Sequence, residues 1–409
     1  MTAAMCGSEL HAEYDAGDVL VVGAGASGLL TASSLASRGL DCTLVEAAGL
    51  GAQQSNHSHG YLHSGYAYLD ARTDFIRDLQ SGSRAWSRMF RELGVVPVTE
   101  TSTIGFSAQL NALAATTHWR RAGLAVAPTA PPTAFRGDLA ACFCAAEPTY
   151  CFSPFFATRS SHASDGVTTR QATVSRLLRD GDRIVGVEVE LEGRLARLRA
   201  DRYVLTAGAS NERLIASATN HRGRVVARTS YMLVVQAPDL PTVSAIFPEN
   251  ELYGLFLASR RHDGETVWLV SNYISFSGGE QTEIARRLWL QGTLRTLRRA
   301  TEVLDMSDVK CGYYVAPKLE LRQQPAAISS YGIDTYGLEN VWVAAPTKLT
   351  LVPPMAEELA EQVATAPSEP RHSTLPRLAS KAVEPQPEMW QAERLALLDD
   401  FCTHYGLRP

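Results

Sequence analysis

The chain has 409 residues, of which 45% are apolar, a composition typical of a globular protein of roughly two to three domains. Its 38 basic and 43 acidic residues give a net charge of -5, which argues against a nucleic-acid-binding surface. The sequence has no apolar run of about 18 residues that could span a membrane. Residues 1–15 lack the basic start and apolar core of a signal peptide, so the cytoplasm is the expected compartment.

The strongest signal lies near the start of the chain. Val19–Val22 is a short apolar run typical of a buried parallel strand, and residues 29–37 resemble a helix that ends at Gly39. A second strand is predicted over residues 42–45 and closes at Glu46. A strand, a glycine-rich turn, a helix, a second strand and an acid in this order indicate a dinucleotide-binding unit.

The glycines between the first strand and the helix explain how this unit would hold a dinucleotide. Gly23 permits the tight turn, Gly25 lets the backbone approach a pyrophosphate, and Gly28 lets the helix pack closely on the strand. The start of the helix offers free N–H groups and the positive end of its dipole to the phosphates. Glu46 would accept hydrogen bonds from the ribose hydroxyls of the adenosine, which disfavours the 2′-phosphate of NADP. FAD and NAD both remain compatible with these residues.

The remaining elements follow along the chain. The predicted sequence of elements is a Gly/Ser/His/Tyr-rich functional loop over residues 50–68, a helix over 73–93, a Pro/Ala/Thr connector over 127–138, and a hairpin made of 184–191 and 195–205. Further predicted elements are strands over 225–235, 267–274 and 341–344, helices over 281–303 and 355–363, a linker over 365–387 and a last helix over 390–401.

Several segments together resemble the D-amino-acid oxidase superfamily of flavoproteins, in particular its glycerol-3-phosphate dehydrogenase and L-2-hydroxyglutarate oxidase branch. Residues 202–210 are similar to the family's strand that ends in an Ala-Gly-Ala turn beside the FAD. The loop from Ser55 to Tyr68 contains Leu62-His63-Ser64-Gly65, which resembles a Leu/Ile-His-Ala/Gly-Gly pattern. Near the C-terminus, Lys348-Leu349-Thr350 followed by Met355-Ala356-Glu357 resembles a stretch of the glycerol-phosphate branch.

The resemblance implies an α/β fold in which a Rossmann-like FAD-binding domain carries an inserted α+β substrate domain. It also implies that the FAD domain is discontinuous in sequence. The expected boundaries are 17–90, 150–220 and 320–365 for the FAD domain, 91–149 and 221–319 for the substrate domain, and 366–409 for a linker and C-terminal helix.

The resemblance further implies the chemistry and the residues that carry it. FAD would take a hydride from a CH–OH or CH–NH carbon of a small substrate and pass electrons to oxygen or another acceptor. The residues expected to bind FAD are Gly23, Gly25, Ala26, Ser27, Gly28, Glu46, Ser55, Val174, Ala207, Gly208, Lys348, Leu349 and Thr350. No metal site is expected, and the oligomeric state is left open.

Three side chains are the candidates for catalysis. His63 could take a proton from the substrate, or it could be the point of covalent attachment of the flavin. Lys348 could stabilise negative charge on the reduced flavin, and Lys318 could contact an anionic group of the substrate as a point charge.

The chain departs from the family pattern in places that bear on the substrate. The turn over residues 344–348 lacks the family's glycines, Val352-Pro353-Pro354 stands where the glycerol-phosphate branch has an Arg, and Lys318 is the cation nearest to the usual carboxylate-binding Arg. These departures disfavour a plain amino acid or glycerol phosphate. The alternatives are a flavin-dependent desaturase or rearrangement enzyme, a flavin-bearing subunit without catalysis, and an NAD enzyme.

Overall fold

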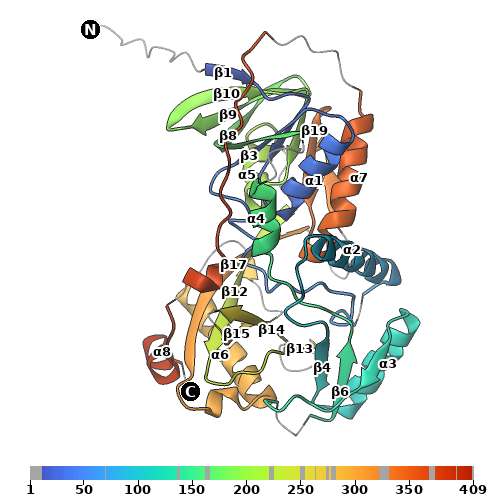
Figure 1. The fold of residues 1–409 in the computed structure, drawn as a ribbon, viewed down its shortest axis with the longest axis vertical. Coiled ribbons are helices and arrows are strands. Elements are labelled where there is room, and N and C mark those ends of the chain that lie inside the picture. Colours follow the sequence, from blue (N-terminus) through green and yellow to red (C-terminus); the bar gives the residue numbers. More distant parts are fainter. Residues whose placement is uncertain are drawn as a thin grey trace.

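The computed structural model has two parts stacked along its long axis (Figure 1). It describes residues 12–69, 71–135, 139–161, 166–220, 225–248, 254–262, 264–272, 276–277, 282–321, 331–367, 374–392 and 394–407. Within these ranges, no helix combines the length and the apolar character needed to cross a membrane.

The first part is built on a sheet that we call the dinucleotide sheet. Its strand order is β18 (Gly332–Asp334), β19 (Val341–Ala345), β11 (Arg202–Leu205), β2 (Val19–Val22), β3 (Cys42–Glu46) and β7 (Val167–Gln171). Its strands pair in parallel except for β18, which runs antiparallel to β19. The sheet joins stretches that are far apart in the sequence, and the predicted mixed α/β class is confirmed.

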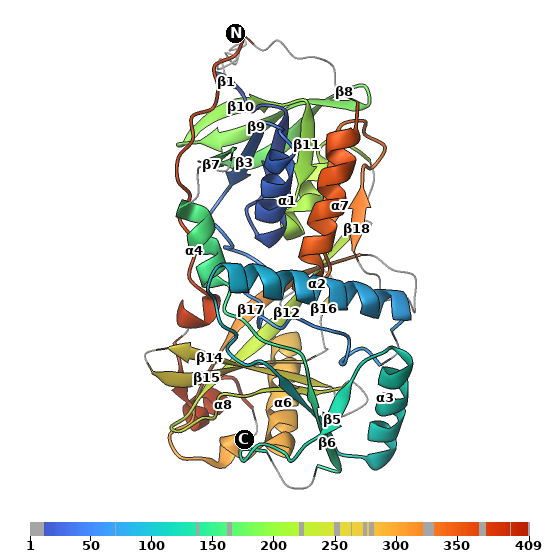
Figure 2. The ribbon, with the colours of Figure 1, turned by 45° about the vertical axis from the view of Figure 1, so that its right-hand side comes forward.

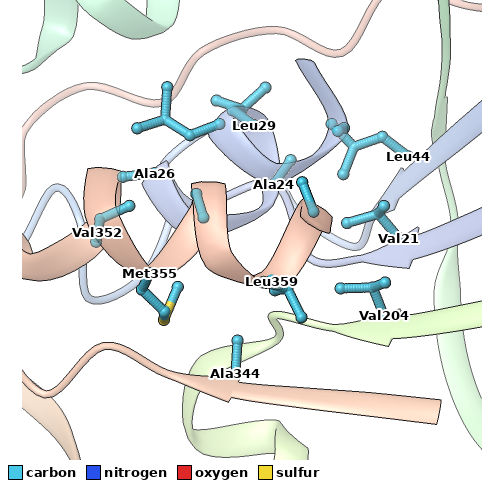
Figure 3. Close-up of a cluster of buried hydrophobic side chains, with 14 of the residues drawn as sticks. Val21, Ala24, Ala26, Leu29, Leu44, Val204, Ala344, Val352, Met355 and Leu359 are labelled. Carbon is cyan, nitrogen blue, oxygen red and sulfur yellow. The ribbon is translucent and has the colours of Figure 1, made fainter. Parts of the chain in front are cut away.

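Both faces of the dinucleotide sheet are covered, which explains why β2 is apolar at every position. Val19 and Val21 face α1 (Ala26–Ser37) and α7 (Val352–Thr365), whose side chains interdigitate over the sheet (Figure 3). Leu20 and Val22 face the opposite way. They contact a second sheet, in the order β1 (Ala12–Asp15), β10 (Arg194–Arg199), β9 (Arg183–Leu191) and β8 (Thr173–Asp180).

The predicted hairpin is present, but its second arm is shorter than expected. β9 and β10 pair antiparallel across Glu192 and Gly193, which both have positive φ (51° and 76°) as a tight hairpin turn requires. Residues 195–205 were expected to form one strand. Instead the chain leaves the hairpin after Arg199 and enters the dinucleotide sheet as β11, so this run divides between two sheets.

The second part of the molecule is a mostly antiparallel sheet that we call the large sheet. Its order is β20 (Ala396–Leu397), β17 (Lys310–Leu321), β12 (Val225–Gln236), β15 (Glu265–Ser271), β14 (Leu255–His262), β13 (Ser244–Phe247), β4 (Ser102–Phe106), β6 (Ala141–Ala145) and β5 (Val126–Pro128), with β16 (Phe276–Ser277) paired to β12. One face packs against α6 (Glu283–Ala300), whose buried Trp289, Leu290 and Leu297 join the core there. On the central strands, Ser230 and Met232 of β12 and Ser271 of β15 line a cavity together with residues of the first part.

The other helices cover edges and the junction between the two parts. Their bounds are α2 (Thr73–Glu92), α3 (Gln109–Arg121), α4 (Ser153–Ser161), α5 (Asn211–Ala216) and α8 (Leu398–His404). Figure 2 shows α2 lying across the junction, below α1 and α7 and above the large sheet.

The segment after α7 differs from the predicted linker. Residues 374–390, which we call the C-terminal strap, run down the side of the molecule from β1 to the large sheet (Figures 1 and 2). Leu378 and Val383 are buried, and Leu50 exchanges backbone hydrogen bonds with Glu384 and Gln386. The predicted last helix over 390–401 is also wrong in extent, because β20 precedes the short α8. An extended chain that bonds through its backbone leaves no periodic pattern in the sequence.

Candidate active site

A cavity of about 500 Å³ lies between the carboxyl ends of the dinucleotide-sheet strands and the large sheet. At one end it is lined by the turn after β2, by Glu46, and by residues 172–174 and 206–210. At the other end it is lined by the loop over residues 52–63, by the turn at 346–349, and by side chains of the large sheet. Ligands of open α/β sheets bind outside the carboxyl ends of the strands, so this is the place where a dinucleotide is expected.

The turn after β2 has the geometry that a pyrophosphate requires. Gly23 has φ of 100°, and a Cβ on Gly28 would lie 1.8 Å from the Gly23 carbonyl oxygen. Gly25, by contrast, would place a Cβ within reach of only the Ser55 hydroxyl, at 3.1 Å. That hydroxyl also accepts a hydrogen bond from the Ala26 N–H at 3.1 Å, at the N-terminus of α1. The glycines therefore close the turn, while the helix start opens onto the cavity.

Glu46 lies at the end of β3, where the sequence predicts the contact with ribose. Its Oε2 accepts a hydrogen bond from the Ala24 N–H at 2.7 Å, and its Oε1 accepts one from the Ala48 N–H at 2.9 Å. A carboxylate has about four acceptor positions, so capacity remains for ribose hydroxyls on the cavity side. Arg213 lines the same end, where its guanidinium donates to the backbone carbonyls of Val174 and Ser175.

The turn after β19 forms without the glycines that the family pattern has at this place. Thr347 adopts φ of 54°, in the left-handed region that a β-branched residue rarely occupies. The next residue, Lys348, lines the cavity with its Nζ 5.8 Å from the centre of the Tyr68 ring. The chain can therefore make the turn without glycine.

His63 lies in this half of the cavity and is 6% exposed. Its Nδ1 lies 3.4 Å from Oε2 of Glu147, a carboxylate with no exposed surface. Oε1 of Glu147 faces the backbone of the residues after His63: the N–H groups of Ser64, Gly65 and Tyr66 lie at 2.6, 3.1 and 3.3 Å. Glu147 thus holds both the loop and the ring.

Aromatic side chains enclose the imidazole of His63. Tyr61 stacks on it with the ring centres 5.2 Å apart, and Tyr68 and Phe256 meet it edge-on at 5.6 and 5.5 Å. The Tyr61 hydroxyl donates to the Leu257 carbonyl at 2.6 Å, which ties the loop to β14. Burial raises the pKa of Tyr61, so this hydroxyl stays protonated. The ring of His63 is consequently fixed on several sides.

The structure brings most of the predicted site residues to the cavity. Those that line it are Gly23, Gly25, Ala26, Ser27, Glu46, Ser55, His63, Val174, Ala207, Gly208, Lys348 and Leu349. Gly28 sits behind the turn, and Thr350 is buried behind His63, accepting its backbone N–H at 2.9 Å. Lys318 pairs with Arg228 in β17 and β12, but its side chain lies outside the described residues.

Sequence reasoning missed Glu147 and the side chains of the large sheet. Glu147 is an isolated acid that follows the apolar run of β6, and an acid next to a buried strand is the signal that could have found it. Among the described residues, no cluster of three or more His, Cys, Asp or Glu side chains could hold a metal ion.

Comparisons with known proteins agree with this geometry. The family model of DAO, FAD dependent oxidoreductase, matches residues 18–362. Probable FAD-dependent oxidoreductase PA4991 of Pseudomonas aeruginosa is 26% identical over 388 residues, which cover 88% of this chain and 94% of that protein. Its crystal structure superposes with a TM-score of 0.66, at 21% identity over 93% of this chain and 98% of that one.

Two further solved structures share the fold. Glycine oxidase from Geobacillus kaustophilus has a TM-score of 0.66 at 17% identity, over 89% of this chain and 96% of its own. Iminodiacetate oxidase from Chelativorans sp. BNC1 has a TM-score of 0.60 at 19% identity, over 89% of this chain and 100% of its own.

Proposed function

The chain belongs to the DAO family of FAD dependent oxidoreductases, and on that premise we propose that it removes a hydride from a CH–OH or CH–NH carbon of a small substrate. FAD is its cofactor and supplies the two-electron acceptor. Oxygen or another acceptor then takes the electrons. Two of the solved structures are named as oxidases of glycine and of iminodiacetate, compounds that contain a CH–NH carbon, which is consistent with this reaction class.

The observation that carries the proposal is the pairing of His63 with Glu147. Because the carboxylate holds Nδ1 at 3.4 Å, it favours the tautomer with the proton on Nδ1, which leaves Nε2 as a hydrogen-bond acceptor. We assign Nε2 the proton that leaves the substrate oxygen or nitrogen when the carbon loses its hydride. The proton and the hydride together are the two hydrogens that convert an alcohol to a carbonyl, or an amine to an imine.

The residues that would hold FAD are assigned from those that line the cavity. The pyrophosphate would lie on the N-terminus of α1, with the adenosine ribose at Glu46 and the adenine beside Val174. The flavin ring would lie toward His63, Ala207 and Gly208, and toward the turn that carries Lys348 and Leu349. Positive charge on Lys348 would stabilise the reduced flavin.

These assignments give the two parts of the molecule their roles. We propose that residues 17–90, 150–220 and 320–365 bind FAD and that residues 91–149 and 221–319 bind the substrate. Support comes from the cavity, because the dinucleotide sheet lines one end and the large sheet lines the other.

The proposal is tested with the purified protein and with His63→Gln. We expect a flavin spectrum in both, and anaerobic bleaching of the visible band by at least one member of a panel of 2-hydroxy acids, amino alcohols and secondary amines. The bleaching rate should fall by about 100- to 10,000-fold in His63→Gln. His404→Gln, a change at an exposed histidine of α8, should leave the rate unchanged.

The possible outcomes distinguish the proposed function from its alternatives. A protein without flavin would contradict the cofactor, and a flavin that no panel member reduces would favour a non-catalytic flavin subunit. Bleaching that His63→Gln leaves unaltered would remove His63 from the mechanism. Flavin colour that stays with the acid-precipitated protein would indicate covalent attachment, which His63→Gln would abolish if His63 were the attachment point.

A further inference from the structure

Two serines in the wall of the large sheet line the cavity. Ser230 lies on β12 and pairs with Ala316 of β17, and Ser271 lies on β15 and pairs with Phe256 of β14. β12 and β15 are neighbours, and all of these residues line the cavity together with Met232. Residues two apart on a strand share a face, so Ser230 and Met232 project the same way.

Both hydroxyls are buried and lack a partner. Ser230 is 0% exposed and Ser271 is 1% exposed, and neither Oγ has a hydrogen-bond partner among the described residues. Buried hydroxyls in proteins are nearly always hydrogen-bonded, because an unmet donor or acceptor costs free energy. Two such hydroxyls, on serines of adjacent strands that line one cavity, indicate that a ligand supplies the missing bonds.

We propose that Ser230 and Ser271 form a subsite that binds an uncharged carbonyl or carboxamide group of the substrate rather than a carboxylate. This inference rests on the proposed function, which makes the cavity the substrate site. It adds a substrate class that the reaction type leaves open.

The charges around the subsite favour a neutral group. The described lining residues of the large sheet are Ser230, Met232, Phe256, Ser271, Asn272 and Ala316, none of which carries a charge. Arg228, two residues before Ser230 on the same face of β12, is not among the residues that line the cavity. A carboxylate enclosed by hydroxyls alone would lose its hydration without gaining a counter-charge. The described Arg and Lys residues that line the cavity are Arg213, at the end that also holds Glu46, and Lys348, in the turn after β19.

His57 adds an acceptor to this wall. Burial lowers the pKa of His57, against the smaller opposing effect of a hydrogen bond with the Val315 backbone, so the ring is neutral at pH 7. Its Nδ1 is buried without a hydrogen-bond partner among the described residues, and His57 lines the cavity. The ring packs edge-on against Tyr314, 5.9 Å away, and Tyr314 pairs with Met232. Because the hydrogen bond with the Val315 backbone uses the N–H of the other ring nitrogen, Nδ1 is left as an acceptor. An N–H or O–H of the ligand satisfies such an acceptor, and a carboxylate cannot.

The test compares two molecules of nearly equal shape and different charge, glycolamide and glycolate, titrated into the FAD-loaded enzyme. Binding is followed by the difference spectrum of the flavin. We expect glycolamide to bind at least about 10-fold more tightly than glycolate. Ser230→Ala and Ser271→Ala should each weaken glycolamide binding by about 10-fold, the effect of one lost hydrogen bond, without weakening glycolate binding.

Ser244→Ala is the matched control. Ser244 is a buried serine of β13 whose hydroxyl is hydrogen-bonded to Thr99 and Thr149, so its loss should lower the Tm but leave both titrations unchanged. Ser230→Ala and Ser271→Ala should not lower the Tm, because their hydroxyls have no partner to lose. A Tm that falls in these two variants would show that the hydroxyls serve the fold and would overturn the subsite.

The inference also fails if glycolate binds as tightly as glycolamide, if the serine variants affect both molecules alike or neither, or if neither molecule perturbs the flavin. These failures are distinct from failure of the proposed function, which is read from reduction of the flavin by the substrate panel. An enzyme reduced by the panel but selective for glycolate would keep the reaction and lose only the neutral subsite.

Discussion

At the scale of single residues, Glu147 decides how His63 can act. Replacing it with Gln preserves the shape but removes the charge that pairs with an imidazolium, so we expect kcat to fall by about 10-fold or more, with KM little changed. Steady-state rates measured with a panel substrate check this.

A double-mutant cycle tests whether Glu147 affects the reaction by orienting the His63 ring or by holding the loop backbone. In a His63→Gln background, Glu147→Gln should cause no further loss of kcat, because the ring that it orients is already gone. If the two losses multiply, Glu147 acts on the reaction through the loop backbone rather than through His63.

At the scale of secondary-structure elements, α2 packs against the backbone of the site at a glycine, Gly82. A Cβ on Gly82 would lie 2.0 Å from the Thr350 carbonyl oxygen, and the hydroxyl of Thr350 accepts the N–H of His63. Gly82→Ala should therefore lower stability by about 1–3 kcal/mol through overpacking, and it should slow flavin reduction. Thermal unfolding and the bleaching rate measure the two effects.

Gly292 provides the control on another helix. It lies within α6, and a Cβ there would meet nothing within 4 Å. Gly292→Ala should raise stability by up to about 1 kcal/mol, the usual gain in a helix. If Gly82→Ala also stabilised the protein, the close approach of α2 to Thr350 would not constrain the site.

The same element scale shows how far the sequence could predict this structure. The dinucleotide unit was predictable because its strand, turn, helix and acid lie within a short stretch whose pattern has one physical explanation. The loop with His63 was predictable from its composition and its resemblance to a family. Glu147 was not, because it meets His63 only after β6 pairs with β4. Ser230 and Ser271 carry no local signal either, because their burial depends on strand register.

At the scale of the whole molecule, the C-terminal strap joins the two parts through a buried ion pair. Glu388 of the strap and Arg260 of β14 are 2% exposed each, with Arg260 Nε 3.0 Å from Glu388 Oε2. The Trp390 indole N–H and the Phe152 backbone N–H also donate to this carboxylate, at 2.6 and 3.1 Å. Removing one partner of such a buried ion pair would leave the other charge uncompensated and would destabilise the folded protein.

This ion pair makes the stability of the molecule depend on pH in a predictable direction. Burial by itself would raise the pKa of Glu388, but Arg260 and the hydrogen bonds outweigh it and hold the pKa below its usual value. A carboxyl group whose pKa is lower in the folded state contributes its stability above the unfolded-state pKa of about 4.3, and loses it as the pH falls through the folded-state pKa.

Glu388→Gln should therefore cost about 3–5 kcal/mol of unfolding free energy at pH 7, because it leaves Arg260 buried without a counter-charge. Thermal unfolding of both proteins from about pH 7 to about pH 3 should show the difference shrinking at the acid end, where Glu388 of the unmodified chain also becomes neutral. Glu357→Gln is the control, since Glu357 is 63% exposed in its pair with Arg38 and such surface pairs contribute at most about 1 kcal/mol. A difference for Glu388→Gln that stayed constant with pH would mean that the strap is held by shape and backbone bonds, and that the charge of Glu388 contributes little to joining the two parts.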